Sequence, residues 1–152
     1  MLQNGQTAPD FVLPDQNGET LALSSLRGNT VVLFFYPKAD TPGCTTEACS
    51  FRDDIALFES ASTIVLGISP NTSRQQKKFA DKFGLPYKLL ADADHAVAEA
   101  YGVWVEKSMY GKKYMGVDRT TFVIAPDGSI AHMFCKVKVE NHASEVLEFF
   151  RS

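Results

Sequence analysis

The sequence has no long apolar run, no excess of basic charge and few cysteines. Its longest apolar run, residues 31–36, is far shorter than the roughly 20 residues that a membrane-spanning helix needs. The formal net charge is -3, from 15 Lys and Arg and 18 Asp and Glu, so no basic field attracts nucleic acid. The N-terminus lacks the basic and apolar segments of a secretory signal. We therefore expect a cytoplasmic protein that binds neither membrane nor nucleic acid.

The chain contains only three cysteines, Cys44, Cys49 and Cys135. This small and odd number does not suit a disulfide scaffold, so any thiol chemistry is expected to be catalytic or transient. With 152 residues, 45% of them hydrophobic, and 11 Phe, the chain has enough apolar material for one core. We therefore expect a single domain over residues 1–152.

Hydrophobic patterning predicts strands that alternate with helices. Residues 31–36 form a continuous β-branched and aromatic run, which is typical of a strand buried on both faces. The expected elements are an edge hairpin over 10–23, a central strand over 31–36, a helix over 42–61, a strand over 64–69, a helix that begins near Thr72 and ends at Gly84, a strand over 87–90, a short helix over 95–101, a loop over 106–118, a hairpin over 120–135 and a helix over 141–150. This order predicts an α/β, thioredoxin-like fold with a central mixed β-sheet flanked by helices on both faces and an N-terminal β-hairpin.

Cys44 is the most informative residue because it lies at the start of a predicted helix. Thr41, Pro42 and Gly43 immediately precede it. Thr41 suits the N-cap, and Pro42 suits the first helical position. The unpaired amides and the positive dipole end of a helix N-terminus favour a thiolate over a thiol, and Gly43 leaves room for a small substrate beside the backbone. The pattern indicates a nucleophilic cysteine.

Packing offers a second interpretation of Cys44. The residue shares an apolar helical stripe with Ala48, Phe51, Ile55 and Phe58, and free cysteines are commonly buried. Periodicity alone favours this interpretation. The cap, the proline and the glycine before Cys44 favour the nucleophile, because packing requires none of them.

Segments along nearly the whole chain resemble those of a known enzyme family. Thr-Pro-Gly-Cys at 41–44, after a Phe-Phe-Tyr-Pro strand end, resembles the peroxidatic-cysteine motif of the peroxiredoxins. Cys49 and the segments 101–104, 109–112 and 119–124 resemble the subfamily of peroxiredoxin Q, also called bacterioferritin comigratory protein. These matches are ordered and correctly spaced from about residue 5 to residue 149. Their combination is far more specific than a Thr-x-x-Cys motif alone.

The resemblance implies a thiol-dependent peroxidase that reduces hydrogen peroxide and organic hydroperoxides to water or alcohols without a cofactor. Cys44 is then the nucleophile that attacks the peroxide and becomes a sulfenic acid. Donors around the O–O bond stabilise the charge that spreads over both oxygens in the transition state. The matching donors are the Thr41 hydroxyl, the Gly43 and Cys44 amides and the Arg119 guanidinium.

The same resemblance gives roles to residues around this centre. Pro42 would shield Cys44 from bulk water. Glu47, one helical turn beyond Cys44, would orient Arg119 through a carboxylate contact, although the helix dipole equally explains an acid at that position. Arg119 taken alone is an ordinary surface cation beside Asp118, and the resemblance turns it into a partner of the thiolate.

Cys49 is implied to be the resolving cysteine, which attacks the sulfenic acid and forms an intramolecular disulfide. On an ideal helix, Cα atoms five residues apart are about 8.6 Å apart, whereas a disulfide tolerates at most about 7 Å. The first turns of the helix are therefore expected to unwind when Cys44 and Cys49 join. A thioredoxin-type dithiol protein is the implied reductant. The Gly-Gly-Leu-Gly segment and C-terminal Tyr-Phe of overoxidation-sensitive relatives are absent, so resolution is expected to compete well with further oxidation.

Other function classes stay open on the residues alone. A structural zinc site would use Cys44, Cys49, Cys135 and His132 or His142, but no compact Cys and His pair follows the first two cysteines. A protein thiol–disulfide oxidoreductase needs a Cys-x-x-Cys motif, which the sequence lacks. A noncatalytic binding module gives no reason for the motif around Cys44.

The remaining expectations concern packing and assembly. Cys135 is expected to pack at the end of its hairpin, and His95 to be a solvent-facing or structural residue. Trp104 and Tyr110 are expected to pack near the site. A monomer is expected, because the sequence has no extended C-terminal arm to exchange between chains.

Overall fold

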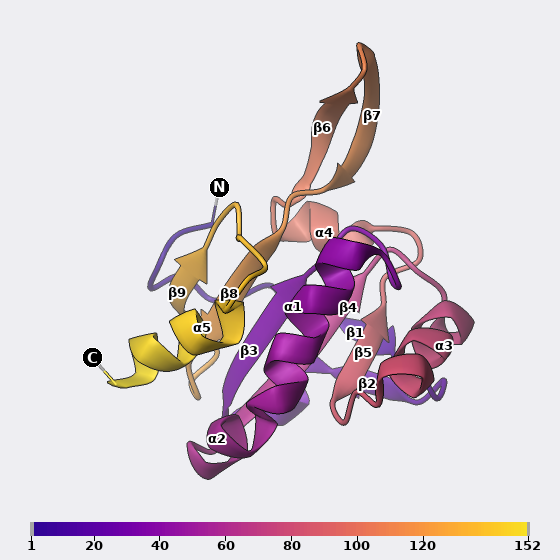
Figure 1. The fold of residues 1–152 in the computed structure, drawn as a ribbon. Helices are drawn as coiled ribbons and strands as arrows, with labels where there is room; N and C mark the ends of the chain where they lie inside the picture. The colour runs from indigo at the N-terminus through magenta and orange to yellow at the C-terminus, as the bar shows by residue number, and fades with distance from the viewer. Residues whose placement is uncertain (1, 152) are drawn as a thin grey trace.

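The computed structural model describes residues 2–151 and has a mixed sheet of five strands at its centre (Figure 1). The strands follow the order β5-β4-β3-β8-β9 across the sheet. They are β3 (Thr30–Phe35), β4 (Thr63–Ser69), β5 (Lys88–Ala91), β8 (Thr120–Ile124) and β9 (Ile130–Phe134). β3 is parallel to β4 and antiparallel to β8. The predicted α/β class and the central place of the 31–36 run are confirmed.

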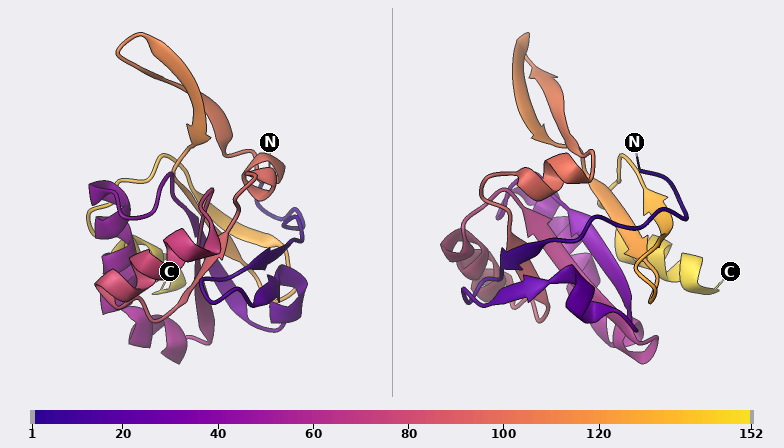
Figure 2. Two further views of the ribbon diagram at one scale, coloured as in Figure 1. Left: turned by 90° about the vertical axis from the view of Figure 1, so that its right-hand side faces the viewer. Right: turned by 180° about the vertical axis from the view of Figure 1, so that it is seen from behind.

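Alternate residues of β3 point into two core layers, one on each face of the sheet. The layer on one face also contains residues of α1 (Pro42–Asp53), α2 (Ile55–Ser60), α3 (Ser73–Phe83) and α5 (His142–Arg151). The other layer contains residues of β2 (Thr20–Ala22), η1 (Leu23–Leu26) and α4 (Ala96–Ala100), and β1 (Val12–Pro14) pairs with β2. The view from behind in Figure 2 shows this N-terminal hairpin on the face away from α1. Within residues 2–151, no helix is long and apolar enough to cross a membrane.

The predicted boundaries of α3 are confirmed by its two caps. The Thr72 hydroxyl accepts from the Gln75 amide, and the Gln75 side chain accepts from the Thr72 amide, which forms a capping box. Gly84 ends the helix in the left-handed conformation. The predicted helix over 42–61 is wrong in one respect, because α1 and α2 are separated at Asp54. There the Asp54 N–H bonds to the Arg52 carbonyl instead of continuing the α-helical ladder.

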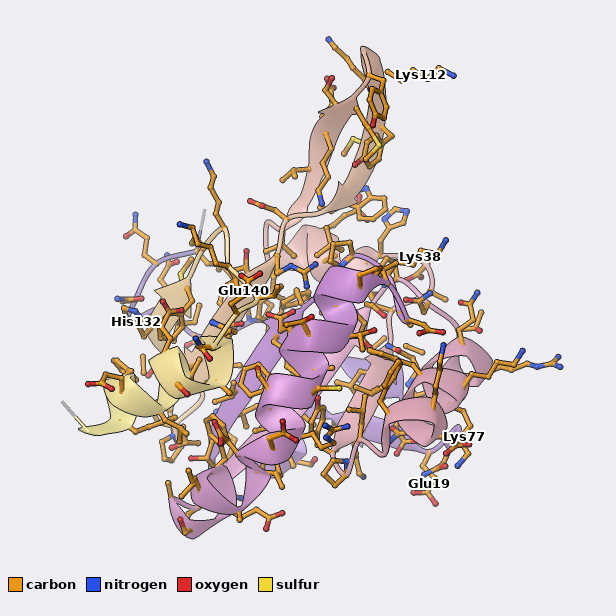
Figure 3. All side chains as sticks on the ribbon, viewed as in Figure 1. Glu19, Lys38, Lys77, Lys112, His132 and Glu140 are labelled. Atoms are coloured by element: carbon orange, nitrogen blue, oxygen red, sulfur yellow. The ribbon has the colours of Figure 1, made fainter. Side chains whose placement is uncertain are left out.

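The expected loop over 106–118 is wrong, because this segment belongs to a β-hairpin that projects from the body (Figure 1). The hairpin consists of β6 (Trp104–Met109) and β7 (Lys112–Val117), and Figure 3 shows the labelled side chain of Lys112 near its tip. Tyr110 and Gly111 form a two-residue turn in which both φ angles are positive. Half of the β6 side chains and most of the β7 side chains are exposed, so the apolar alternation that marks a half-buried strand is missing.

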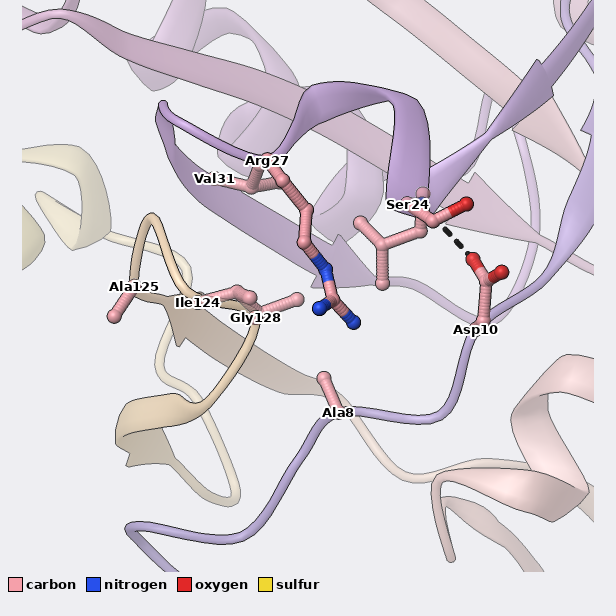
Figure 4. Close-up of a pocket in the computed structure, with 9 residues that line it drawn as sticks. Ala8, Asp10, Ser24, Arg27, Val31, Ile124, Ala125 and Gly128 are labelled. Atoms are coloured by element: carbon pink, nitrogen blue, oxygen red, sulfur yellow. Dashed lines mark hydrogen bonds between the residues drawn. The ribbon is translucent and has the colours of Figure 1, made fainter.

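A small cavity lies between the N-terminal segment and the turn from β8 to β9 (Figure 4). Its lining includes Ala8, Asp10, Arg27 and Gly128, and its volume is about 10 Å³, room for roughly one water molecule. An added Cβ at Gly128 would lie 2.9 Å from the Arg27 guanidinium. None of the predicted site residues lines this cavity, so we interpret it as a packing feature.

Candidate active site

Cys44 lies in the first turn of α1, which begins a few residues after the end of β3. The residue is only 1% exposed and packs in the core layer beneath α1, so the packing interpretation describes part of its environment. The first helical hydrogen bond runs from the Thr45 amide to the Thr41 carbonyl at 2.8 Å. The Gly43 and Cys44 amides precede that bond and have no acceptor within the helix. Two backbone donors therefore lie in the same helical turn as the enclosed sulfur.

Arg119, between β7 and β8, bonds to two side chains of α1. Its Nη2 donates to Cys44 Sγ at 3.3 Å, and its Nη1 donates to Glu47 Oε1 at 2.7 Å. Gly43 permits this approach, because an added Cβ there would lie 3.3 Å from Arg119 Nη2. The guanidinium cannot lose its charge near neutral pH. It therefore places a permanent positive charge beside the sulfur.

Glu47 is fully buried, and its Oε2 has no hydrogen-bond partner among the described residues. Burial raises the pKa of Glu47 to about 7, even though Arg119 acts in the opposite direction. The contact expected between Glu47 and Arg119 is present. The helix dipole alone does not explain why an acid is buried here, because an exposed carboxylate would serve the dipole equally well.

We expect Glu47 to make stability depend on pH. Its pKa is about 7 in the folded chain against 4.5 for an ordinary glutamate, so the folded state holds the extra proton between these values. The resulting stabilisation is complete below the lower value and is lost as the pH rises through the higher one, a change on the order of 3 kcal/mol. Urea unfolding of reduced wild type and Glu47→Gln, from about pH 4 to about pH 8, measures it. The stability of wild type relative to the variant should fall as the pH rises.

The comparison with Glu47→Gln also cancels the effect of His142, which changes the stability with pH in the opposite direction. Burial lowers the pKa of His142, so that residue makes the protein less stable as the pH falls. Because both proteins contain His142, its effect cancels in their difference. A difference that is constant across the pH range would show that folding does not shift the pKa of Glu47.

Thr41 and Pro42 occupy the expected positions at the start of α1. The Thr41 hydroxyl does not cap the helix and instead donates to the Lys38 carbonyl at 2.9 Å. Pro42 is exposed and Thr41 is partly buried. The two residues therefore form the outer edge of the site, and their roles toward a peroxide stay predictions.

The sequence analysis missed Lys107, which lies in the segment that was expected to be a loop. The partly buried side chain extends along β7, where an added Cβ at Gly116 would lie 3.4 Å from Lys107 Cδ. Burial lowers the pKa of Lys107, with Arg119 acting in the same direction, while Asp118 and Cys44 favour its charged form. Lys107 therefore contributes a second cation to the field around Cys44.

Cys49 follows Cys44 by five residues in the unbroken helix α1, and both are free thiols. Cys49 is partly buried. The residues proposed for a zinc site do not come together, since no three His, Cys, Asp or Glu side chains among residues 2–151 are grouped so that they could hold a metal ion.

Two expectations about packing are wrong. Cys135 is exposed because β9 ends at Phe134, which leaves the cysteine beyond the strand. Tyr110 is 98% exposed because it forms the tip of the projecting hairpin. Trp104, at the base of that hairpin, is partly buried and stacks on the His95 ring at 4.0 Å, which gives His95 a structural role.

The arrangement of strand, helix and cysteine has counterparts among known proteins. Residues 4–133 match the family model described as the AhpC/TSA family. The chain belongs to the AhpC/TSA family. A Coxiella burnetii relative is 49% identical over 96% of this chain and 97% of its own length. Peroxiredoxin Bcp of Bacillus subtilis is 45% identical over 97% of this chain and 94% of its own length.

A solved structure supports the same assignment within the AhpC/TSA family. The bacterioferritin comigratory protein of Xanthomonas campestris, studied for its alkyl peroxide reduction activity, superposes with a TM-score of 0.88 and is 35% identical. The match covers 93% of this chain and 90% of that one. The expected thioredoxin-like fold and the resemblance to peroxiredoxin Q are confirmed.

Proposed function

We propose that this AhpC/TSA family member is a thiol-dependent peroxidase in which Cys44 reduces hydrogen peroxide and organic hydroperoxides. The observation that carries the proposal is the bond from Arg119 to the Cys44 sulfur at the N-terminus of α1. It places a fixed cation and two free backbone donors around one buried thiol. The activity studied in the Xanthomonas relative supports the organic hydroperoxides as substrates.

In the proposed first step, the Cys44 thiolate attacks the terminal oxygen of the peroxide. The S–O bond forms as the O–O bond breaks, and the electron pair leaves on an alkoxide or hydroxide that takes a proton from water. Sulfur is oxidised to a sulfenic acid while the peroxide is reduced by two electrons. The Gly43 and Cys44 amides and Arg119 donate to the oxygens, and the Thr41 hydroxyl joins them by turning away from Lys38. Because Cys44 is enclosed, only the O–OH end of an organic peroxide reaches the sulfur.

The proposed second step joins Cys44 to Cys49. The Cys49 sulfur attacks the sulfenic sulfur, the S–S bond forms, and the hydroxyl leaves as water. Because both residues lie in one α-helix, the first turns of α1 must unwind for the sulfurs to meet. A thioredoxin-type dithiol protein then reduces the disulfide by exchange and α1 refolds.

The proposal extends to assembly and location. An intramolecular disulfide needs no second subunit, which supports a monomer. One central sheet with a core layer on each face supports a single peroxiredoxin domain over residues 1–152. The small and odd number of cysteines suits a reducing compartment, which supports the cytoplasm.

Intact mass after one equivalent of peroxide tests the assignment of the two cysteines. We expect wild type to lose about 2 mass units through the disulfide and Cys49→Ser to gain about 16 through a stable sulfenic acid. Cys135→Ser is the matched control and should behave as wild type, because Cys135 is exposed and lies outside α1. Loss of the disulfide in Cys135→Ser and its retention in Cys49→Ser would assign resolution to Cys135 instead.

A further inference from the structure

Tyr87 makes a buried hydrogen bond to the helix segment between the two cysteines. Its hydroxyl donates to the Ala48 carbonyl at 2.6 Å. The ring packs edge-on against Phe34, and both Tyr87 and Ala48 are buried. Burial raises the pKa of Tyr87 well above its usual range, so the hydroxyl keeps its proton and acts as a donor at physiological pH.

The bonded carbonyl belongs to the peptide unit that connects Ala48 to Cys49. In a regular helix this carbonyl already accepts from the Arg52 amide, and Tyr87 adds a second donor. Bringing Cys49 to Cys44 requires this peptide unit to move, because their helical separation of about 8.6 Å exceeds disulfide reach. That movement breaks the Tyr87 bond and leaves its hydroxyl buried without this acceptor.

Oxidation of Cys44 acts on a different part of the helix. Before oxidation, Arg119 holds the first turn of α1 through Cys44 and Glu47. Conversion of the thiolate to a neutral sulfenic acid weakens the attraction between Arg119 and the sulfur. The Tyr87 hydroxyl bonds to the Ala48 carbonyl and not to Arg119 or the Cys44 sulfur. Its bond therefore stays in place after the chemical step and resists unwinding.

We propose that Tyr87 is a positioning residue that controls the fate of oxidised Cys44 by holding α1 in its folded form. This inference rests on the proposed function and on Cys49 as the resolving residue. The sulfenic acid has two fates: attack by Cys49, which releases water, or attack on a second peroxide molecule, which gives a sulfinic acid and an alcohol or water. The folded helix keeps Cys44 among the peroxide-binding donors and favours the second fate. Unwinding favours the disulfide.

Tyr87→Phe tests this role, with Tyr101→Phe as the matched control. Tyr101 is also buried, and its hydroxyl donates to the Pro9 carbonyl at 2.7 Å in the opposite core layer. Each variant loses one hydroxyl-to-carbonyl bond and keeps its ring. During turnover with excess reductant and rising hydrogen peroxide, intact mass gives the sulfinic fraction per turnover. We expect Tyr87→Phe to lower that fraction about fivefold, the factor that one hydrogen bond provides, and Tyr101→Phe to leave it unchanged.

A second measurement tests whether Tyr87 stabilises α1 and does not depend on oxidation of Cys44. Hydrogen exchange of reduced protein, followed in peptides from residues 42–53, should be about fivefold faster in Tyr87→Phe and unchanged in Tyr101→Phe. Equal sulfinic fractions in wild type and Tyr87→Phe, or equal exchange in the two variants, would overturn the proposal. If wild type fails to form the disulfide, the proposed pairing of Cys44 with Cys49 fails, and the exchange result still decides whether Tyr87 holds the helix.

Discussion

Cys44→Ser is expected to reduce thiol-dependent peroxide consumption to the rate of buffer alone, a loss of about 10³-fold or more. The thiolate is the nucleophile in thiol chemistry, and a serine hydroxyl attacks only when a neighbouring base takes its proton. Within residues 2–151, the side chain that bonds to Cys44 is Arg119, a permanent cation that cannot take this proton. Peroxide loss and reductant oxidation, followed together, measure the effect.

The controls for this variant separate chemistry from folding. Serine differs from cysteine by one atom, so urea unfolding of Cys44→Ser should stay within about 1 kcal/mol of wild type. Cys135→Ser removes a different thiol, exposed on the surface, and should keep full activity. Equal peroxide consumption by wild type and Cys44→Ser would remove the basis for a peroxidase centred on this residue.

Local sequence signals predict the parts of the fold that depend on local chemistry. The β3 strand is recognisable because every residue from 31 to 36 is apolar and buried, as a central strand requires. The boundaries of α3 follow from Thr72 and Gln75 at one end and Gly84 at the other. In each case the residues that identify the element also make the contacts that stabilise it.

The parts that the sequence does not predict depend on contacts between distant segments or on an absence of burial. The β6 and β7 strands pair mainly with each other, and more than half of their side chains are exposed. Their sequences therefore show no hydrophobic periodicity from which the strands could be predicted. Their turn places Tyr110 at a positive φ angle, a conformation that residues other than Gly, Asn and Asp rarely adopt. In the sequence, only Gly111 indicates a turn at this place. The interruption at Asp54 has no proline or glycine to mark it.

The candidate site also contains residues that the local sequence predicts and residues that it does not. Cys44 is recognisable because the cap, the proline and the glycine before it are neighbours in the sequence. The burial of Glu47 and the approach of Lys107 arise only when segments far apart in the sequence pack together. Arg119 lies 75 residues from Cys44, and the family resemblance alone identified it. Spacing along the chain therefore indicates the nucleophile, and tertiary structure determines the charges around it.

Arg119 connects the nucleophile to the buried acid, so its replacement is expected to have the second largest effect. Arg119→Gln should lower the rate constant for oxidation of Cys44 by about 10²–10³-fold, because it removes a charged donor from the reacting oxygens and the cation beside the sulfur. Substoichiometric peroxide followed by rapid thiol alkylation, in a Cys49→Ser background, measures this step alone. Arg27→Gln is the control, because Arg27 lines the small cavity away from Cys44.

The same substitution leaves Glu47 buried without its cation, and this second effect must be separated from the first. Breaking a buried ion pair costs about 3–5 kcal/mol, or less if the carboxylate takes up a proton instead. In the double variant Arg119→Gln/Glu47→Gln, no buried carboxylate is left unpaired, so urea unfolding should recover much of the lost stability. The oxidation rate should stay low, because the donor to Cys44 is still missing. Recovery of the rate in the double variant would mean that Arg119 serves only to neutralise Glu47 and takes no part in peroxide reduction.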